Sequence, residues 1–420
     1  MNTWTVARHP AILAVAVVLF SAATADAAST AQRLAQVIQQ IEALPYQPDY
    51  LPVGLDSAFA PALVPNAAAA QDYTTGSVPG SPDAPAWPMA FHPVTLDSAD
   101  GARLTGMLAL HQGRHPGIVV VHGFNTHGNL SVIRWAAMLY ANGYNVLAAD
   151  QRDFSAEYSA GYGYPNFPQT FGWKESQDVV AAGRFLKRQP GVTSAGVVGF
   201  SEGAQNTVLA LAQTGTTVFD AALTFSGPAD QNAQIYSTAV PAGCATPNCS
   251  YPATGALINL VVPPYTFNDP CTALAYAGTY YAVDPFDILA RESAYRAQTG
   301  VKTPLLNFYA ADDPLVLPFH AVMMAGYGNE ARQTRMVSRG AHAYFFDRWW
   351  QQQATLLYFK AMLPGASADL SIGTAPTVDQ TPGGAPLSTQ LVNLGAPSRA
   401  QADAYLAPYV CDTGRGSPGS

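Results

Sequence analysis

The chain carries little charge. Lys, Arg, Asp and Glu make up 11% of its 420 residues, and 20 basic residues stand against 28 acidic ones, which leaves a net charge of −8. No long basic run interrupts the sequence. Binding to nucleic acid needs clustered positive charge that neutralises phosphates, so we expect no nucleic-acid partner. Hydrophobic residues make up 49%, which is typical of a globular protein and not of a disordered one.

Motifs for metals and nucleotides are missing as well. Histidines and carboxylates do not gather at the spacing of metal ligands. The phosphate-binding pattern G-x-x-x-x-G-K-[ST] is absent, and we see no internal repeat. We therefore predict neither a metal site nor a cofactor.

Long apolar runs are absent except at the N-terminus. Residues 11–25, "AILAVAVVLFSAATA", follow Arg8 and His9 and lead into the small-x-small sequence "ADA" at 25–27. This pattern predicts a secretory signal peptide over 1–27 and a secreted or periplasmic protein. An uncleaved membrane anchor is the alternative, but the run is short for a span and its small residues favour cleavage.

Cysteine is scarce, with four residues at Cys244, Cys249, Cys271 and Cys411. An even number in an exported chain indicates two disulfides, for which three pairings are possible. A zinc site is the alternative. The Cys244–Cys249 spacing is loose for zinc and no histidine lies nearby, so disulfides are favoured.

The pattern along the chain changes near residues 90 and 364. Segments 28–89 and 364–420 are rich in Ala, Pro and Gly, and we interpret them as an extended N-terminal arm, with one helix over 29–44, and a C-terminal extension. Between them, strands alternate with helices, which predicts parallel strands joined by right-handed crossovers in an α/β domain over 90–363. The expected strands are 91–96, 102–111, 117–124, 145–150, 195–201, 220–227, 303–312 and 334–340, and the expected helices are 129–144, 173–189, 204–213, 320–328 and 344–363.

The alternation lapses over residues 228–300. This segment contains three cysteines, several prolines and many aromatic residues, and we interpret it as an insertion. Its aromatic side chains could form a lid over a site or a core beneath disulfide-bound loops.

The sequence "GFSEG" at 199–203 fits G-x-S-x-G, with a predicted strand before it and a predicted helix after it. In this context Ser201 is a candidate nucleophile at a sharp turn, where larger residues in place of the glycines would collide. The turn would present the hydroxyl near a helix N-terminus, whose amides favour developing negative charge. A turn serine without catalytic role is the alternative.

A serine nucleophile needs a base and an acid that orients the base. "SRGAHAYF" supplies His342 after the last strand, and "NFYAADDPLVLP" supplies Asp312 and Asp313 after the strand before it. The alternatives are a histidine that packs on the aromatic helix and aspartates that shape a turn.

"VVVHGFNTHGN" follows the third strand, and Gly123 lets the backbone turn there. The backbone amides of Phe124 and Glu202 could then point at one spot and form an oxyanion hole. His122 and His127 flank this turn, and we expect them to pack locally.

Taken in order, H-G-F, G-F-S-E-G, D-D-P-L-V and G-A-H resemble the α/β-hydrolase superfamily over about residues 90–363. The resemblance implies a mostly parallel central sheet with helices on both faces, an insertion after strand six that commonly covers the pocket, and the order serine, acid, histidine. It assigns the acid to Asp313, directly before "P-L-V", with Asp312 as the alternative. Asp150 and Arg152 fall where relatives often carry a structural D-x-R, although Asp153 replaces the glycine that commonly follows.

These residues predict a secreted serine hydrolase that cleaves carboxylic esters of small molecules or polymers through an acyl-enzyme. A secreted peptidase or amidase of the same fold is the first alternative, and a binding protein that has lost catalysis is the second. Dehalogenation of haloalkanes is disfavoured, because that branch uses an aspartate where this chain has Ser201. The sequence indicates neither the substrate-binding residues nor the oligomeric state.

Overall fold

A computed structural model describes residues 30–47, 89–123, 132–152, 172–230, 233–234, 293–313, 315–343, 346, 348–363 and 384–405. The predicted signal peptide, all four cysteines and most of the predicted insertion lie outside these residues. The predictions about cleavage, disulfides and a lid therefore stay predictions.

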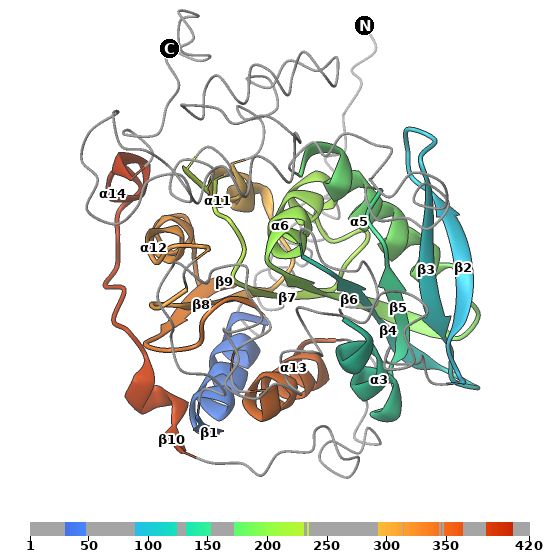
Figure 1. The fold of residues 1–420 in the computed structure, drawn as a ribbon, viewed down its shortest axis with the longest axis horizontal. Coiled ribbons are helices and arrows are strands. Elements are labelled where there is room, and N and C mark those ends of the chain that lie inside the picture. Colours follow the sequence, from blue (N-terminus) through green and yellow to red (C-terminus); the bar gives the residue numbers. More distant parts are fainter. Residues whose placement is uncertain are drawn as a thin grey trace, which may run out of the picture.

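The core of the fold is an eight-stranded sheet with the order β2-β3-β5-β4-β6-β7-β8-β9 (Figure 1). Strands β2 and β3 form an antiparallel hairpin at one edge, β3 pairs antiparallel with β5, and the remaining pairs are parallel. The mostly parallel sheet predicted from the alternation is confirmed. The strands are β2 His92–Asp97, β3 Arg103–Ala109, β4 His115–Val121, β5 Asn145–Ala149, β6 Val192–Phe200, β7 Ala221–Phe225, β8 Leu305–Ala310 and β9 Arg332–Val337.

Helices cover both faces of the sheet (Figure 1). On one face lie α5 Trp173–Lys187, α6 Glu202–Thr214, α11 Ala294–Ala297 and α12 Phe319–Gly326. On the other face lie α3 Ile133–Ala141, α13 Arg348–Met362 and a helix that includes residues 30–42.

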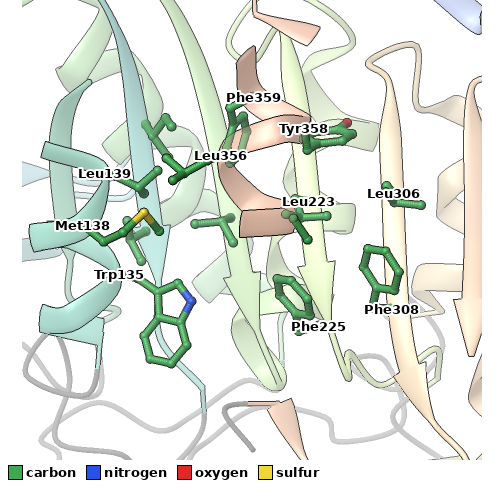
Figure 2. Packing of buried hydrophobic residues seen from close by; sticks show 14 of the residues in the cluster. Trp135, Met138, Leu139, Leu223, Phe225, Leu306, Phe308, Leu356, Tyr358 and Phe359 are labelled. Atoms are coloured by element: carbon green, nitrogen blue, oxygen red, sulfur yellow. The ribbon is translucent and has the colours of Figure 1, made fainter. Parts of the chain in front are cut away.

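The central strands are buried on both sides, as apolar runs such as "GIVVV" predict for parallel strands. Along β4, Ile118 and Val120 belong to the hydrophobic core under α3 and α13, whereas Val119 and Val121 belong to the core under α5 and α6. This alternation follows from the period of two along a strand. Figure 2 shows side chains of α3, α13, β7 and β8 that belong to the first core.

A helix of the N-terminal segment packs into the domain. Leu34 and Ile41, on the helix that includes residues 30–42, are fully buried in the first core. Strand β1 Pro45–Tyr46 then pairs antiparallel with β10 Ala385–Pro386 of the C-terminal extension. Because each strand has two residues, no alternating pattern in the sequence could indicate it.

After β10 the chain continues through the short helix η6 Leu387–Gln390 to α14 Arg399–Ala404. Leu391 forms an antiparallel bridge with Val337 at the end of β9. The C-terminal extension thus adds a short contact to the edge of the large sheet.

The borders of the predicted insertion belong to the domain core. Ala229, Ala294 and Tyr295 are buried in the second hydrophobic core, although the sequence pattern assigned them to the insertion. In the part of the chain that the structure describes, no helix is both long and apolar enough to cross a membrane.

Arg152 follows β5 and is buried between acidic side chains. Its guanidinium lies 2.7 Å from Asp178 and 2.7 Å from Asp100, while Asp150 accepts a hydrogen bond of 2.6 Å from Thr105 Oγ1. Both residues of the D-x-R sequence therefore join neighbouring elements and support the sheet edge, in agreement with a structural role.

Candidate active site

Ser201 lies at the sharp turn between β6 and α6. Its backbone has φ 53° and ψ −124°, in a region that residues other than glycine rarely adopt. Its N–H donates to Phe225 O at the end of β7, 2.9 Å away, which fixes the turn to the neighbouring strand. Strain of this kind costs about 1–3 kcal/mol and persists where the surrounding structure enforces it.

Steric contact explains the two glycines around Ser201. A Cβ at Gly199 would lie 2.5 Å from Gly203 O, and a Cβ at Gly203 would lie 2.2 Å from His122 O. Both distances are far inside van der Waals contact. The strand and the helix can approach this closely only because neither position has a side chain, as the G-x-S-x-G pattern predicts.

His342 joins Ser201 to Asp313. Its Nε2 lies 2.7 Å from Ser201 Oγ, and its Nδ1 lies 2.9 Å from Asp313 Oδ2. A carboxylate only accepts, so the proton belongs on Nδ1, and Nε2 is left to accept from the serine hydroxyl. The three residues follow β6, β8 and β9, whose carboxyl ends meet at one edge of the sheet.

The two adjacent aspartates have different partners. Asp313 is buried and accepts from the N–H groups of Leu315 and Val316, at 2.9 Å each, in addition to His342. Asp312 Oδ1 instead accepts from the N–H groups of Gly340 and Ala341, at 2.8 and 3.0 Å. The structure places Asp313 against the imidazole and Asp312 against the backbone of the loop before it.

Residues on either side of His342 are strained and tightly held. Ala341 has φ 44° and Ala343 has φ 46°. Ser226 Oγ accepts from the N–H of Ala343 at 3.1 Å, and Gln351 Nε2 donates to the carbonyl of Ala343 at 2.8 Å. No pattern in the sequence indicates the roles of Ser226 and Gln351 or the backbone contacts of Asp312, because polar residues at a strand end and inside a helix carry no signal that identifies their partners.

Gly123 packs directly against the serine turn, since a Cβ there would lie 2.8 Å from Ser201 Cβ. Glu202 is the first residue of α6, so its backbone amide is at the positive end of the helix dipole. Phe124 lies outside the described residues. The predicted oxyanion hole therefore stays a prediction.

His122 supports the turn after β4. Its Nδ1 donates to Gly123 O at 2.8 Å, and its Nε2 accepts from the N–H of Gln151 at 3.1 Å. Burial lowers the pKa of His122 to about 4. The ring is therefore neutral at pH 7 and packs locally, as expected, whereas His127 lies outside the described residues.

Metal ligands do not gather in the described part of the chain: no group of three or more His, Cys, Asp or Glu side chains there could hold an ion.

The chain is similar to known hydrolases over part of its length. No protein-family model matches it. It is 35% identical over 103 residues to the thiohydrolase aneE of Aspergillus aculeatus, a match that covers 24% of this chain and 30% of that protein. The chain thus spans less than a third of this relative.

Solved structures with a similar course of the chain include two from Pyrococcus species. The esterase Pf2001 of Pyrococcus furiosus is 19% identical, with 65% of this chain and 93% of that chain covered and a TM-score of 0.44. The acylaminoacyl peptidase of Pyrococcus horikoshii is 17% identical, with 65% of this chain and 42% of that chain covered and a TM-score of 0.45.

The strand order itself identifies the fold. An antiparallel hairpin leads into a parallel sheet in which β5 lies between β3 and β4, and the strained serine turn follows β6. This is the α/β-hydrolase fold, and it confirms the fold class that the sequence motifs predicted.

Backbone strain at Ser201 predicts a difference between two variants that both lack the hydroxyl. Ser201→Gly should be more stable than Ser201→Ala by about 1 kcal/mol, because glycine adopts the positive φ without a Cβ clash. Urea unfolding of the two variants measures this difference. Equal stability, or a more stable alanine variant, would show that the turn is relaxed.

Burial of neutral His122 predicts a loss of stability in mild acid. The unfolded histidine takes up a proton near pH 6.5 and the folded one only near pH 4, so stability is complete above pH 6.5 and falls as the pH is lowered toward 4. The slope from this group should reach about 1.4 kcal/mol per pH unit. Unfolding free energies of wild type and His122→Gln between pH 7 and 4.5 should differ in slope by this amount, and parallel curves would contradict the prediction.

Proposed function

We propose that the chain is a serine hydrolase that cleaves carboxylic esters through an acyl-enzyme. The observation that carries this proposal is the pair of contacts made by His342, 2.7 Å from Ser201 Oγ on one side and 2.9 Å from Asp313 Oδ2 on the other. A fold alone does not imply catalysis, so the proposal rests on this geometry.

In the first half of the reaction, Ser201 Oγ attacks the acyl carbon while its proton moves to His342 Nε2. Asp313 accepts from Nδ1–H throughout and stabilises the imidazolium that forms. The tetrahedral intermediate collapses, the bond to the leaving oxygen breaks, and His342 returns the proton to the departing alcohol. An ester of Ser201 remains.

In the second half, water takes the place of the alcohol. The oxygen of a water molecule attacks the acyl carbon while His342 Nε2 accepts a proton from this water. His342 then passes the proton to Ser201 Oγ as the acid departs. The amides of Phe124 and Glu202 are the proposed donors to the oxyanion in both halves. An amide at the N-terminus of α6 is suited to this task because the helix dipole favours negative charge there.

The leaving group is the open part of the proposal. The named activity of the Aspergillus aculeatus relative is thiohydrolysis, which makes thioesters the second substrate class to test beside oxygen esters. The same three side chains could also cleave amides, so a peptidase remains an outcome of the experiment.

The proposed triad of Ser201, His342 and Asp313 predicts hydrolysis of esters. Wild type should hydrolyse p-nitrophenyl esters in a series from acetate to palmitate, and Ser201→Ala and His342→Ala should each lose at least about 10³-fold in kcat. An acyl thioester series and aminoacyl anilides, assayed in parallel, identify the preferred leaving group. Full activity of Ser201→Ala would exclude the mechanism.

The neighbouring aspartates offer a matched control. Asp313→Asn should lose about 10³–10⁴-fold in kcat, because a neutral amide lacks the negative charge that stabilises the imidazolium, and its NH2 group can donate to Nδ1 and favour the wrong tautomer. Asp312→Asn should lose much less, since its amide oxygen can still accept from Gly340 and Ala341. The reverse ranking would assign the acid to Asp312.

The N-terminal sequence supports a second, separate proposal, that the protein is exported and cleaved after residue 27. An arginine and a histidine, an apolar run and small residues at the junction are the signal-peptide pattern.

This proposal predicts that the exported protein begins at Ala28. Mass spectrometry of the periplasmic or secreted product measures its N-terminus, and Ala27→Arg should impair processing because the cleavage site requires a small residue. A full-length chain that remains in the membrane fraction would indicate an anchor.

A further inference from the structure

Residues that take no part in the proposed reaction also hold the loop that carries His342. We call residues 338–343 the histidine loop. The core holds this loop through Asp312 and Ser226, whose side chains accept from its backbone. The two terminal extensions hold it from the opposite direction.

Tyr46, on β1, reaches the histidine loop from 293 residues away. Its hydroxyl donates to Arg339 O at 2.5 Å, and its side chain is fully buried. A Cβ at Gly340 would lie 3.0 Å from the same hydroxyl oxygen. The tyrosine therefore lies directly against the backbone, three residues before His342.

One peptide unit of the loop is bound at both of its polar groups. The carbonyl of Arg339 accepts from Tyr46, and the N–H of Gly340, which belongs to the same peptide plane, donates to Asp312 Oδ1 at 2.8 Å. Two bonds on opposite sides of a planar unit prevent it from rotating. The orientation of this plane sets the direction in which the chain enters Ala341 and His342.

The loop needs such restraint because its conformation is strained. Ala341 and Ala343, the two neighbours of His342, both have positive φ. A non-glycine residue remains in this region only where its surroundings leave no alternative.

Tyr46 is itself fixed by α13 and by the C-terminal extension. Its ring packs edge-on against Trp350 with centroids 5.2 Å apart, and its carbonyl accepts from Gln390 Nε2 at 2.9 Å. Gln390 O in turn accepts from the N–H of Ser338, at the start of the histidine loop, at 2.7 Å. The C-terminal extension thus binds both the tyrosine and the loop that the tyrosine supports.

We propose that Tyr46 is a positioning residue for His342, and that the paired terminal extensions form a clasp that holds the general base within hydrogen-bonding distance of Ser201. This inference rests on the proposed function. Small displacements of catalytic groups cost large factors in rate, so loss of one clasp hydrogen bond should appear in kcat more than in substrate binding.

Tyr358 supplies a matched control. Like Tyr46 it is fully buried and donates to a backbone carbonyl, here Pro304 O at 2.8 Å. Pro304 precedes β8 at the end of the strand opposite to Asp312. Tyr46→Phe and Tyr358→Phe each remove one oxygen atom and one buried hydrogen bond, but only the first bond involves the histidine loop.

The experiment measures kcat, KM, the melting temperature and the rate at which a fluorophosphonate labels Ser201 in the full chain. Tyr46→Phe should lower kcat and the labelling rate by about ten-fold or more with KM unchanged, whereas Tyr358→Phe should stay within about two-fold of wild type. The two variants should lose similar amounts of melting temperature.

Other outcomes overturn the inference. Equal losses of kcat in both variants would reduce Tyr46 to a general stabilising role, and wild-type kcat in Tyr46→Phe would rule out the positioning role. Ser201→Ala and His342→Ala separate this failure from that of the proposed function. If those two are inactive while Tyr46→Phe is unaffected, only the clasp is wrong; if they are active, the hydrolase mechanism fails and the positioning role fails with it.

Discussion

A single hydrogen bond of 2.7 Å, between Ser201 Oγ and His342 Nε2, joins two loops that are 141 residues apart in the chain. The bond depends on the order of the parallel strands, because β6, β8 and β9 must end at the same edge of the sheet. The helices and hydrophobic cores on both faces of the sheet hold those strand ends in place. The candidate site is therefore a property of the whole α/β domain.

The strained backbone of the described residues is concentrated around this bond. The four non-glycine residues with positive φ among them are Ser201, Ser226, Ala341 and Ala343. Ser226 and Ala343 bond each other, and the alanines flank His342. Strain of this kind is typical of functional sites, where the surrounding packing offsets a local cost and fixes groups before substrate binds.

The neighbouring polar residues act on backbone atoms more than on one another's side chains. Asp312 and Ser226 accept from loop amides, His122 donates to the carbonyl of Gly123, and Tyr46 donates to that of Arg339. Each bond fixes the course of a loop that carries a candidate catalytic group. The terminal extensions, which lie outside the sheet, take part in this support through Tyr46 and Gln390.

Much of this arrangement could be predicted from the sequence. The alternating strands and helices predicted the sheet, and the glycines around Ser201 predicted a turn too close for side chains. His342 follows the last predicted strand, and an aspartate follows the strand before it. Local patterns predict these strands, and the rules of right-handed connection predict how they are joined.

Only the tertiary structure decided the rest. It separated Asp313 from Asp312, since the orientation of two adjacent carboxylates depends on loops distant in the chain. It also paired β1 with β10 and brought Tyr46 to the histidine loop, through two-residue strands too short to leave a periodic signal. Local sequence determines which elements form and where they begin, whereas contacts between distant segments depend on how the elements pack, and no local pattern records them.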